Sequence, residues 1–334
     1  MKYIEIGDSK LRASVIGLGT WVTGGGQVWG EDPDDDASIR AIQASLDKGV
    51  NLIDTAPAYG FGRSEKVVGK AIQERRDKVV LATKCGLWWQ DKRGSFFVEN
   101  FDGKTLYRSL RPDTIQIEIE DSLRRLRTDY IDLYQVHWPA IEPDKTPIEE
   151  TMACLNQLKD DGKIREIGVS NVSLDELKEY AQHGSIASNQ FRYSMLYRDP
   201  EAEMLPFCAN NNIATLTYMS LEQGLLTGKV GMDREFVEGE WRNSEDWNPW
   251  FKKANRAAIL EMLDGWKSLT SKYDCTLAQL TIAWTAAQHG VTHVLCGART
   301  PEQALDNAAA GKLELEKADL DQIRNDVETL GQPV

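Results

Sequence analysis

Short apolar segments alternate with amphipathic segments along almost the whole chain. In the amphipathic segments apolar residues recur at helical spacing, as Ile39, Ile42 and Leu46 do, and Gly49 and Gly162 stand where helices are expected to end. The apolar segments are hydrophobic nearly throughout, which is typical of strands covered on both faces. We expect strands at 14–18, 51–55, 79–84, 130–137, 164–170, 186–190, 213–220 and 293–297, and helices at 38–49, 64–73, 114–126, 147–162, 173–181, 203–211, 256–273 and 301–310.

Eight such strand and helix pairs predict an α/β fold of the (β/α)8 or TIM barrel type. An open doubly wound sheet is the alternative, but no G-x-G-x-x-G follows an early strand. No linker divides the chain, so we expect residues 1–334 to form one barrel domain. Three additions are expected: an N-terminal hairpin in 2–14, a long loop after strand seven at 228–255, and a C-terminal extra helix at 317–330.

Composition and charge restrict the class of protein. Hydrophobic residues make up 41% and charged residues 27% of the chain, which fits a soluble globular protein. The net charge of -13 argues against nucleic-acid binding, which requires an excess of Lys and Arg. No apolar run is long enough for a membrane span and the first residues lack a signal-peptide core, so we expect a cytoplasmic protein. These features leave homo-oligomer formation open.

The cysteines and histidines give no metal-binding pattern. The five cysteines are scattered and contain no C-x-x-C pair, so we expect reduced thiols. The four histidines do not cluster with ligand spacing, so we expect no metal site.

Four polar residues follow consecutive predicted strands. Asp54 ends the second strand with Tyr59 in its loop, Lys84 ends the third, and His137 ends the fourth. Active sites of such barrels lie at the carboxyl ends of the strands, and adjacent strands are ~4.8 Å apart, so these groups should lie within ~10 Å. Singly, each of them is an ordinary loop, packing or core residue. Together they predict a site that donates a proton to a carbonyl oxygen.

The expected chemistry depends on charge. A tyrosine is a weak acid, with a pKa near ~10, and an adjacent Lys84 ammonium should lower the pKa of Tyr59. Asp54 should keep Lys84 charged despite burial, and His137 should hydrogen-bond the same carbonyl oxygen. An aldolase-like or isomerase-like use of Lys84 as a Schiff base is an alternative, but it requires an unpaired amine.

The last two strand ends resemble a phosphate-binding site. Thr300, Pro301 and Gln303 have the spacing of a helix capping box, next to Arg299. After strand seven, SLEQGLLTGK supplies glycines and Lys229. The alternative is an ordinary capped surface helix.

The segments GLGTW, DTAPAYGFGRSE, ATKCG, DLYQVHWP, IREIGVSN and GLLTGK resemble, in order and spacing, those of the aldo-keto reductase superfamily. The similarity is greatest to the bacterial branch of inositol-operon and general stress reductases. The resemblance implies a catalytic tetrad of Asp54, Tyr59, Lys84 and His137, in which the tyrosine is general acid in reduction and base in oxidation.

The resemblance also implies an extended nicotinamide dinucleotide. It implies that Ser170, Asn171 and Gln190 hold the carboxamide and that Tyr218 stacks on the nicotinamide. The pyrophosphate would lie along Ser220, Leu221, Gly224, Thr227, Gly228 and Lys229, and the adenosine end at Arg299, Gln303 and Asn307. Further contacts are expected at Gly19, Thr20, Trp21, Asp54, Leu226 and Gly297. The guanidinium of Arg299 favours NADP(H) over NAD(H). The family more usually has a proline where this chain has Met219-Ser220.

Tryptophans follow several strand ends. Trp21, Trp88, Trp89 and Trp138 are predicted to contact substrate, and Trp29, Trp241, Trp247 and Trp250 lie in long loops. Indole faces suit sugars, cyclitols or compact aldehydes and ketones, whereas Glu222 weakly disfavours anions. We therefore expect an NADPH-dependent carbonyl reductase, possible in reverse as a polyol oxidation. The alternative is a regulatory nucleotide-binding subunit similar to potassium-channel β-subunits.

Overall fold

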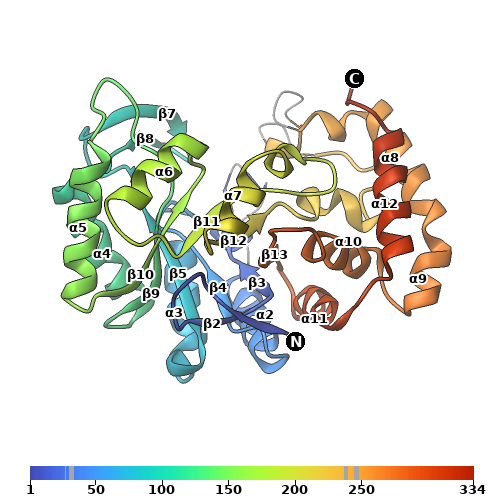
Figure 1. Cartoon of the computed structure of the whole chain (residues 1–334), viewed down its shortest axis with the longest axis horizontal. Helices are drawn as coiled ribbons and strands as arrows, with labels where there is room; N and C mark the ends of the chain where they lie inside the picture. Colours follow the sequence, from blue (N-terminus) through green and yellow to red (C-terminus); the bar gives the residue numbers. More distant parts are fainter. Residues whose placement is uncertain (27, 30–33, 237–239, 244–247) are drawn as a thin grey trace.

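Eight parallel strands pair in chain order and close into a barrel. This computed structural model describes residues 1–26, 28–29, 34–236, 240–243 and 248–334, and Figure 1 shows how its strands and helices are arranged. The last strand pairs with the first, because Leu295 and Gly297 lie opposite Gly17 and Gly19. The predicted (β/α)8 barrel is thereby confirmed. Its strands are β3(Ile16–Gly19), β4(Leu52–Asp54), β5(Val80–Cys85), β9(Ile131–Val136), β10(Ile164–Ser170), β11(Ser188–Arg192), β12(Ala214–Tyr218) and β13(His293–Gly297).

Helices alternate with the barrel strands along the chain. They are α2(Asp35–Asp47), α3(Arg63–Ile72), α4(Pro112–Leu126), α5(Ile148–Asp160), α6(Leu174–Gln182), α7(Met204–Asn210), α10(Leu277–Ala286) and α11(Pro301–Ala309). Gly49 and Gly162 have φ values of 87° and 74°, as their predicted place at helix ends requires. Short helical segments are α1(Trp21–Gly24), η1(Arg76–Lys78), η2(Asp199–Glu201), η3(Glu222–Thr227), η4(Trp241–Asn243), η5(Pro249–Phe251) and η6(Ala310–Lys312).

The helical region before β13 differs from the prediction. The single helix expected at 256–273 is two helices, α8(Lys253–Gly265) and α9(Lys267–Tyr273), which meet at the buried Trp266. A third helix, α10, was not predicted, although it contacts β13. Its sequence LAQLTIAWTA is apolar on nearly every face, so it lacks the amphipathic period by which helices are recognised.

Two of the three predicted additions are confirmed. The strands β1(Tyr3–Glu5) and β2(Arg12–Ser14) form the N-terminal hairpin, and α12(Lys317–Thr329) is the C-terminal helix. The loop after strand seven contains η4 and η5 among its described residues. Trp247 lies outside the described residues.

A further addition was missed by the sequence analysis. Between β5 and α4, the strands β6(Leu87–Trp88), β7(Ser95–Phe101) and β8(Lys104–Arg108) form an antiparallel sheet, here called the hairpin sheet. Asp102 and Gly103 turn between β7 and β8 with positive φ values of 47° and 78°. An Asp-Gly pair between strand-like runs is a strong hairpin signal, so this element was readable from sequence.

The barrel interior changes from apolar to polar along the strands. Leu52, Leu133 and Leu295 belong to a core cluster, and a Cβ at Gly17 would lie 2.7 Å from Leu295. Two residues further along their strands, Leu52 is followed by Asp54 and Leu133 by Gln135. Since side chains two apart face the same side of a strand, the polar groups lie at the carboxyl end of the barrel.

A buried ion pair ties the helices to the strand that carries Lys84. Glu65 of α3 accepts from Arg125 Nε at 2.6 Å and from Thr83 Oγ1 of β5 at 2.7 Å, and its side chain is fully buried. Thr83 adjoins Lys84, so this contact fixes β5 next to the candidate site.

We predict that Glu65→Ala lowers the free energy of unfolding by about 3–5 kcal/mol, because the buried charge of Arg125 would lose its contact of 2.6 Å and keep only the longer one of 3.8 Å to Asp121. Glu120→Ala is the matched control, since Glu120 and its partner Lys163 are both partly exposed and surface pairs contribute about 0–1 kcal/mol. Urea denaturation measures both. Equal losses in the two variants would contradict the importance of the buried pair.

Candidate active site

The four residues Asp54, Tyr59, Lys84 and His137 lie together at the carboxyl end of the barrel. Lys84 Nζ donates to Asp54 Oδ1 at 2.6 Å, to the Thr55 carbonyl at 2.9 Å and to the Tyr59 hydroxyl at 3.3 Å. The rings of Tyr59 and His137 meet edge to face, with centroids 5.8 Å apart. The three hydrogen bonds of Lys84 Nζ use all three donors of an ammonium group, so Lys84 has the geometry of a charged amine.

The turn after β4 holds Tyr59 at this position. Gly62 donates its amide to the Pro57 carbonyl at 2.7 Å and Tyr59 donates its amide to Ala56 at 3.2 Å, which closes the turn. A Cβ at Gly24 would lie 2.7 Å from the Tyr59 backbone. Glycine is therefore required where α1 approaches this turn.

Two glutamines orient the second oxygen of Asp54. Asp54 Oδ2 accepts from Gln135 Nε2 at 3.0 Å and from Gln190 Nε2 at 2.8 Å. Gln190 was predicted to bind a nicotinamide carboxamide, whereas here its amide nitrogen binds Asp54. Gln135 was missed, although it precedes His137 by two residues and so must share its inward face.

Burial dominates the titration of these groups. Burial, and then the Asp54 charge, raise the pKa of Tyr59 well above 10.0. Burial lowers the pKa of Lys84 from 10.5, and Asp54 opposes that shift. The expectation that Lys84 lowers the Tyr59 pKa is therefore wrong for this structure, since desolvation of a phenolate outweighs the cation.

The surroundings of His137 favour the neutral imidazole. Burial first, and then the charges of Lys84 and Arg108, hold the pKa of His137 well below 6.5. A neutral imidazole can still donate one hydrogen bond to a carbonyl oxygen.

The residues predicted to hold the nicotinamide end are grouped on neighbouring strands. Asn171 follows β10 with φ 58° and donates to the His137 carbonyl at 3.0 Å and to Ser170 Oγ at 3.0 Å. Tyr218, at the end of β12, donates its hydroxyl to Asn171 Oδ1 at 2.7 Å. Through these hydrogen bonds, the residues that are expected to bind the nicotinamide are connected directly to His137.

The loop after β12 has an unusual backbone. Met219, Glu222, Gln223 and Gly224 all have positive φ, between 43° and 96°. A proline cannot adopt the φ of 62° found at Met219, whereas Ser220 is not among the residues with positive φ. Ser220 adjoins β13 through Cys296 Sγ at 3.7 Å, and Leu221, Leu226, Thr227, Gly228 and Lys229 lie in or beside η3.

The adenosine end is built around α11. Thr300 caps the helix by accepting from the Gln303 amide, but Gln303 Oε1 accepts from the Arg299 amide at 2.8 Å rather than from the cap residue. Only half of the predicted capping box therefore forms. Arg299 Nη2 donates to the Trp29 carbonyl at 3.0 Å, and Asn307 Nδ2 donates to the Gly297 carbonyl at 3.0 Å.

These residues fit a nicotinamide dinucleotide. Gln223 Oε1 is buried without a hydrogen-bond partner beside Gly224, where a Cβ would meet only Val230 at 4.0 Å. Gly19 and Gly297, opposite one another on β3 and β13, also lack a side chain at the barrel mouth. Thr20 donates its hydroxyl to the Asp54 carbonyl at 2.9 Å, so it braces the site from β3.

Aromatic side chains surround Tyr59. Trp21 stacks on Tyr59 with centroids 6.1 Å apart and meets Trp29 and Trp241 edge to face. Trp89 contacts Phe61 at 5.3 Å, and Trp138 contacts Phe97 at 6.1 Å. Three further aromatic residues of this region were not predicted. Phe61 comes from the turn after β4, and Phe97 and Phe101 come from the hairpin sheet.

Two expectations about the substrate pocket are corrected by these contacts. Trp88 is only 1% exposed and donates its indole N–H to Asp91 at 2.7 Å, so it packs the hairpin sheet instead of lining the mouth. Glu222 is buried and accepts from Arg192 at 2.6 Å and Ser194 at 2.5 Å. Its charge is compensated within the protein and gives no reason to exclude anions.

The chain matches the model of the aldo/keto reductase family over residues 15–327. It belongs to the aldo/keto reductase family. It is 43% identical, over 99% of both chains, to a protein of Escherichia coli (strain K12) named NADH-specific methylglyoxal reductase. The structure of a glycerol dehydrogenase from Gluconobacter oxydans superposes with a TM-score of 0.86 at 37% identity, over 99% of this chain and 96% of that one.

A regulatory relative is less similar to this aldo/keto reductase. A probable voltage-gated potassium channel subunit beta of Arabidopsis thaliana is 31% identical over 93% of this chain and 91% of that protein. Members of the family use a nicotinamide cofactor, in agreement with the fit above.

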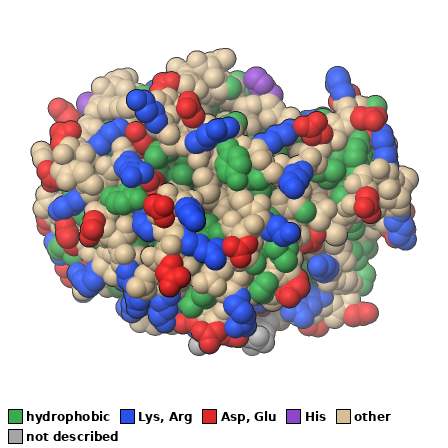
Figure 2. All heavy atoms as spheres, turned by 90° about the horizontal axis from the view of Figure 1, so that it is seen from below, with side chains coloured by type: hydrophobic (Ala, Val, Ile, Leu, Met, Phe, Trp, Pro, Cys, Tyr) green, Lys and Arg blue, Asp and Glu red, His purple; other side chains and the backbone are tan. Residues whose placement is uncertain are grey.

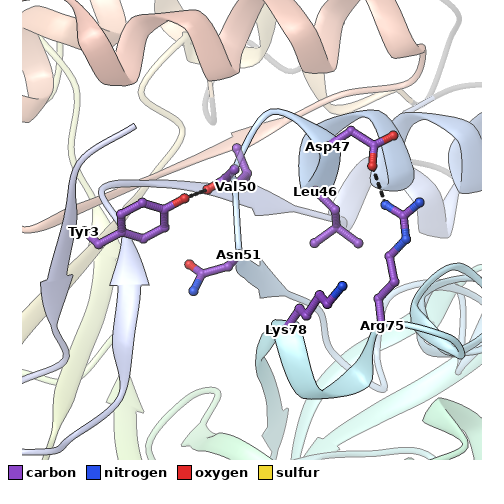
Figure 3. A pocket seen from close by; sticks show the side chains of 8 residues that line it. Tyr3, Leu46, Asp47, Val50, Asn51, Arg75 and Lys78 are labelled. Atoms are coloured by element: carbon purple, nitrogen blue, oxygen red, sulfur yellow. Dashed lines mark hydrogen bonds and ion pairs between the residues drawn. The ribbon is translucent and has the colours of Figure 1, made fainter.

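Other surfaces of the described structure have simpler explanations. A hollow of about 500 Å³ at the amino end of β4 is lined by Tyr3, Asp47, Arg75 and Lys78, but Arg75 already pairs with Asp47 (Figure 3). Acidic and basic side chains intermingle over the face seen in Figure 2.

Within the described residues, no group of side chains has the arrangement of a metal site, and no helix has the length and apolarity to cross a membrane.

We predict that His137 stays neutral at pH 6.5 in the cofactor-free protein, because burial and two neighbouring cations oppose its protonation. Nitrogen-15 NMR of labelled histidines measures this, and His137→Gln identifies the resonance. A midpoint at the ordinary value of 6.5 would contradict the described surroundings of His137.

Proposed function

We propose that this aldo/keto reductase reduces the carbonyl group of a sugar-like, cyclitol-like or small aldehyde or ketone to an alcohol, with a reduced nicotinamide dinucleotide. The contact of 3.3 Å between Lys84 Nζ and the Tyr59 hydroxyl carries the proposal, because it joins a proton donor to a cation. The relative named methylglyoxal reductase supports the reductive direction, and the relative named glycerol dehydrogenase supports the oxidative direction.

In the proposed reaction Tyr59 donates its proton to the carbonyl oxygen. Lys84 already donates to the phenol oxygen, so the ammonium stabilises the phenolate that this transfer creates. Neutral His137 donates a hydrogen bond to the same carbonyl oxygen. Asp54 holds Lys84 in position. A reduced nicotinamide, when bound by the residues described above, would supply the hydride for the carbonyl carbon.

The raised pKa of Tyr59 favours reduction at neutral pH. A phenol that stays protonated is ready to act as the acid, whereas alcohol oxidation requires a phenolate as the base. Oxidation of a polyol therefore becomes faster as the pH rises towards the Tyr59 pKa.

A Schiff base at Lys84 receives no support from these contacts. The amine is fully buried and all three of its donors are used, so a carbonyl substrate would have to displace Asp54, Thr55 or Tyr59. The regulatory alternative rests on a relative of lower identity than the methylglyoxal reductase. The intact acid site favours an enzyme.

Cofactor preference is proposed to depend on Arg299. Its guanidinium is held beside Trp29, 5.6 Å from the ring centroid, at the amino end of α11. A guanidinium and a helix N-terminus together suit the 2′-phosphate of NADPH. We therefore propose NADP(H) over NAD(H), although the relative in Escherichia coli is named NADH-specific.

We predict that Tyr59→Phe lowers the rate of carbonyl reduction about 10²–10⁴-fold, the usual contribution of a general acid. Cofactor binding should be unchanged, because the ring and its stacking with Trp21 remain. Nicotinamide absorbance measures turnover and tryptophan fluorescence quenching measures binding. Full activity in this variant would exclude the proposed proton donor.

Arg299→Ala should weaken NADPH binding about 10-fold or more and NADH binding far less, because only NADPH carries a phosphate for the guanidinium. Dissociation constants from fluorescence titration test this. Glu302→Gln is the control, since it changes a charge beside the same helix end without removing the guanidinium. Equal weakening of both nucleotides by Arg299→Ala would remove the proposed phosphate contact.

A further inference from the structure

Arg108 is a half-buried cation that has no hydrogen-bond acceptor or acid as a partner among the described residues. It ends β8 of the hairpin sheet, and its guanidinium carbon lies 4.3 Å from the ring centroid of Phe97 and 4.8 Å from that of Trp138. Within the described residues it forms no hydrogen bond or ion pair, and its buried Nε has no acceptor. Aromatic faces attract the charge but provide no oxygen acceptor for these N–H groups.

Neighbouring arginines of the same region are compensated differently. Arg93 pairs with Asp91 and Asp113, and Arg125 pairs with Glu65. These examples show that acids are available to arginines along this stretch of the fold. The missing acid at Arg108 is therefore a specific feature of that position.

Arg108 faces the candidate active site. Trp138, which it contacts, directly follows His137, and the charge of Arg108 contributes to the lowered pKa of His137. The acid whose charge reaches Arg108 is Glu176, but that carboxylate is bound to the Ser173 amide and hydroxyl in a capping box. Among the described residues no acid is therefore left for Arg108, and a ligand in the mouth of the barrel can supply an oxygen acceptor in place of water.

We propose that Arg108 binds a second oxygen of the substrate and thereby selects short carbonyl compounds that carry an additional carbonyl or carboxylate oxygen. The inference rests on the proposed reductase function and names its substrate class. Guanidinium N–H groups lie in one plane, so aromatic contacts on the faces leave the in-plane donors free for such an oxygen. Arg108 is then a specificity-determining residue on the side of the hairpin sheet.

The test compares oxygenated aldehydes with simple aldehydes of similar size. Methylglyoxal is paired with propanal, and succinic semialdehyde with butanal. Arg108→Met keeps a long apolar chain between Phe97 and Trp138 but removes the donors. A hydrogen bond to a charged group contributes about 1.5–3 kcal/mol, so kcat/KM should fall about 10- to 100-fold for the oxygenated member of at least one pair.

The simple aldehydes should change less than about twofold in Arg108→Met, since they have no second oxygen to lose. If kcat/KM falls with methylglyoxal alone, the preferred substrate is a neutral dicarbonyl compound. If it falls with succinic semialdehyde alone, the preferred substrate carries a carboxylate. Arg108→Lys should restore part of the loss with the carboxylate substrate, because it returns the charge. Arg93→Met is the matched control, as Arg93 lies over Trp88 but pairs with acids.

Equal losses for oxygenated and simple aldehydes, or no loss for any, would overturn the proposal for Arg108. The NMR midpoint of His137 provides a second measurement and should rise in Arg108→Met, because one cation facing the imidazole is gone. An unchanged midpoint would show that Arg108 does not face the site. A wild-type protein that reduces none of the four aldehydes would instead refute the proposed reductase function.

Discussion

The buried carboxylate of Asp54 organises the carboxyl end of the barrel. One of its oxygens binds Lys84 and the other accepts from Gln135 and Gln190, so residues of three other strands converge on this one group of β4. An isolated carboxylate would be very costly to bury, and these three donors make its burial tolerable. In return the carboxylate fixes the direction in which Lys84 points, and the contact with Tyr59 follows from that direction.

The same burial decides which protonation states the site contains. It keeps Tyr59 as a phenol and His137 as an imidazole, and it works against the charge of Lys84, which Asp54 supports. A site with a neutral acid, a neutral hydrogen-bond donor and one supported cation is prepared for negative charge to develop on a substrate oxygen. In the proposed reaction, proton donation therefore depends on desolvation together with a single ion pair.

The barrel and the grouping of the tetrad were predictable from sequence because both depend on order along the chain. Strand and helix alternation fixes which ends meet, and Asp54, Lys84 and His137 stand at three consecutive ends. Helix α10 was not predictable from periodicity, since a helix that is apolar on all faces has no amphipathic signal. The predicted direction of the shift in the Tyr59 pKa was also wrong. That shift depends on how deeply the hydroxyl is buried, which the spacing of residues in the sequence does not reveal.

Two cations stand at the barrel mouth, and they differ in what compensates their charge. Lys84 is neutralised by Asp54, a residue of the barrel itself, so its position is set before any ligand arrives. Arg108 comes from the hairpin sheet, an insertion between β5 and α4, and within the part of the chain that the structure describes its guanidinium contacts aromatic rings but no acid. Rigid strands thus carry the groups that must not move, while a loop insertion carries a cation whose compensation is left to the ligand. Under the proposed function, this division lets the geometry of proton transfer stay constant while the insertion determines which carbonyl compounds are bound.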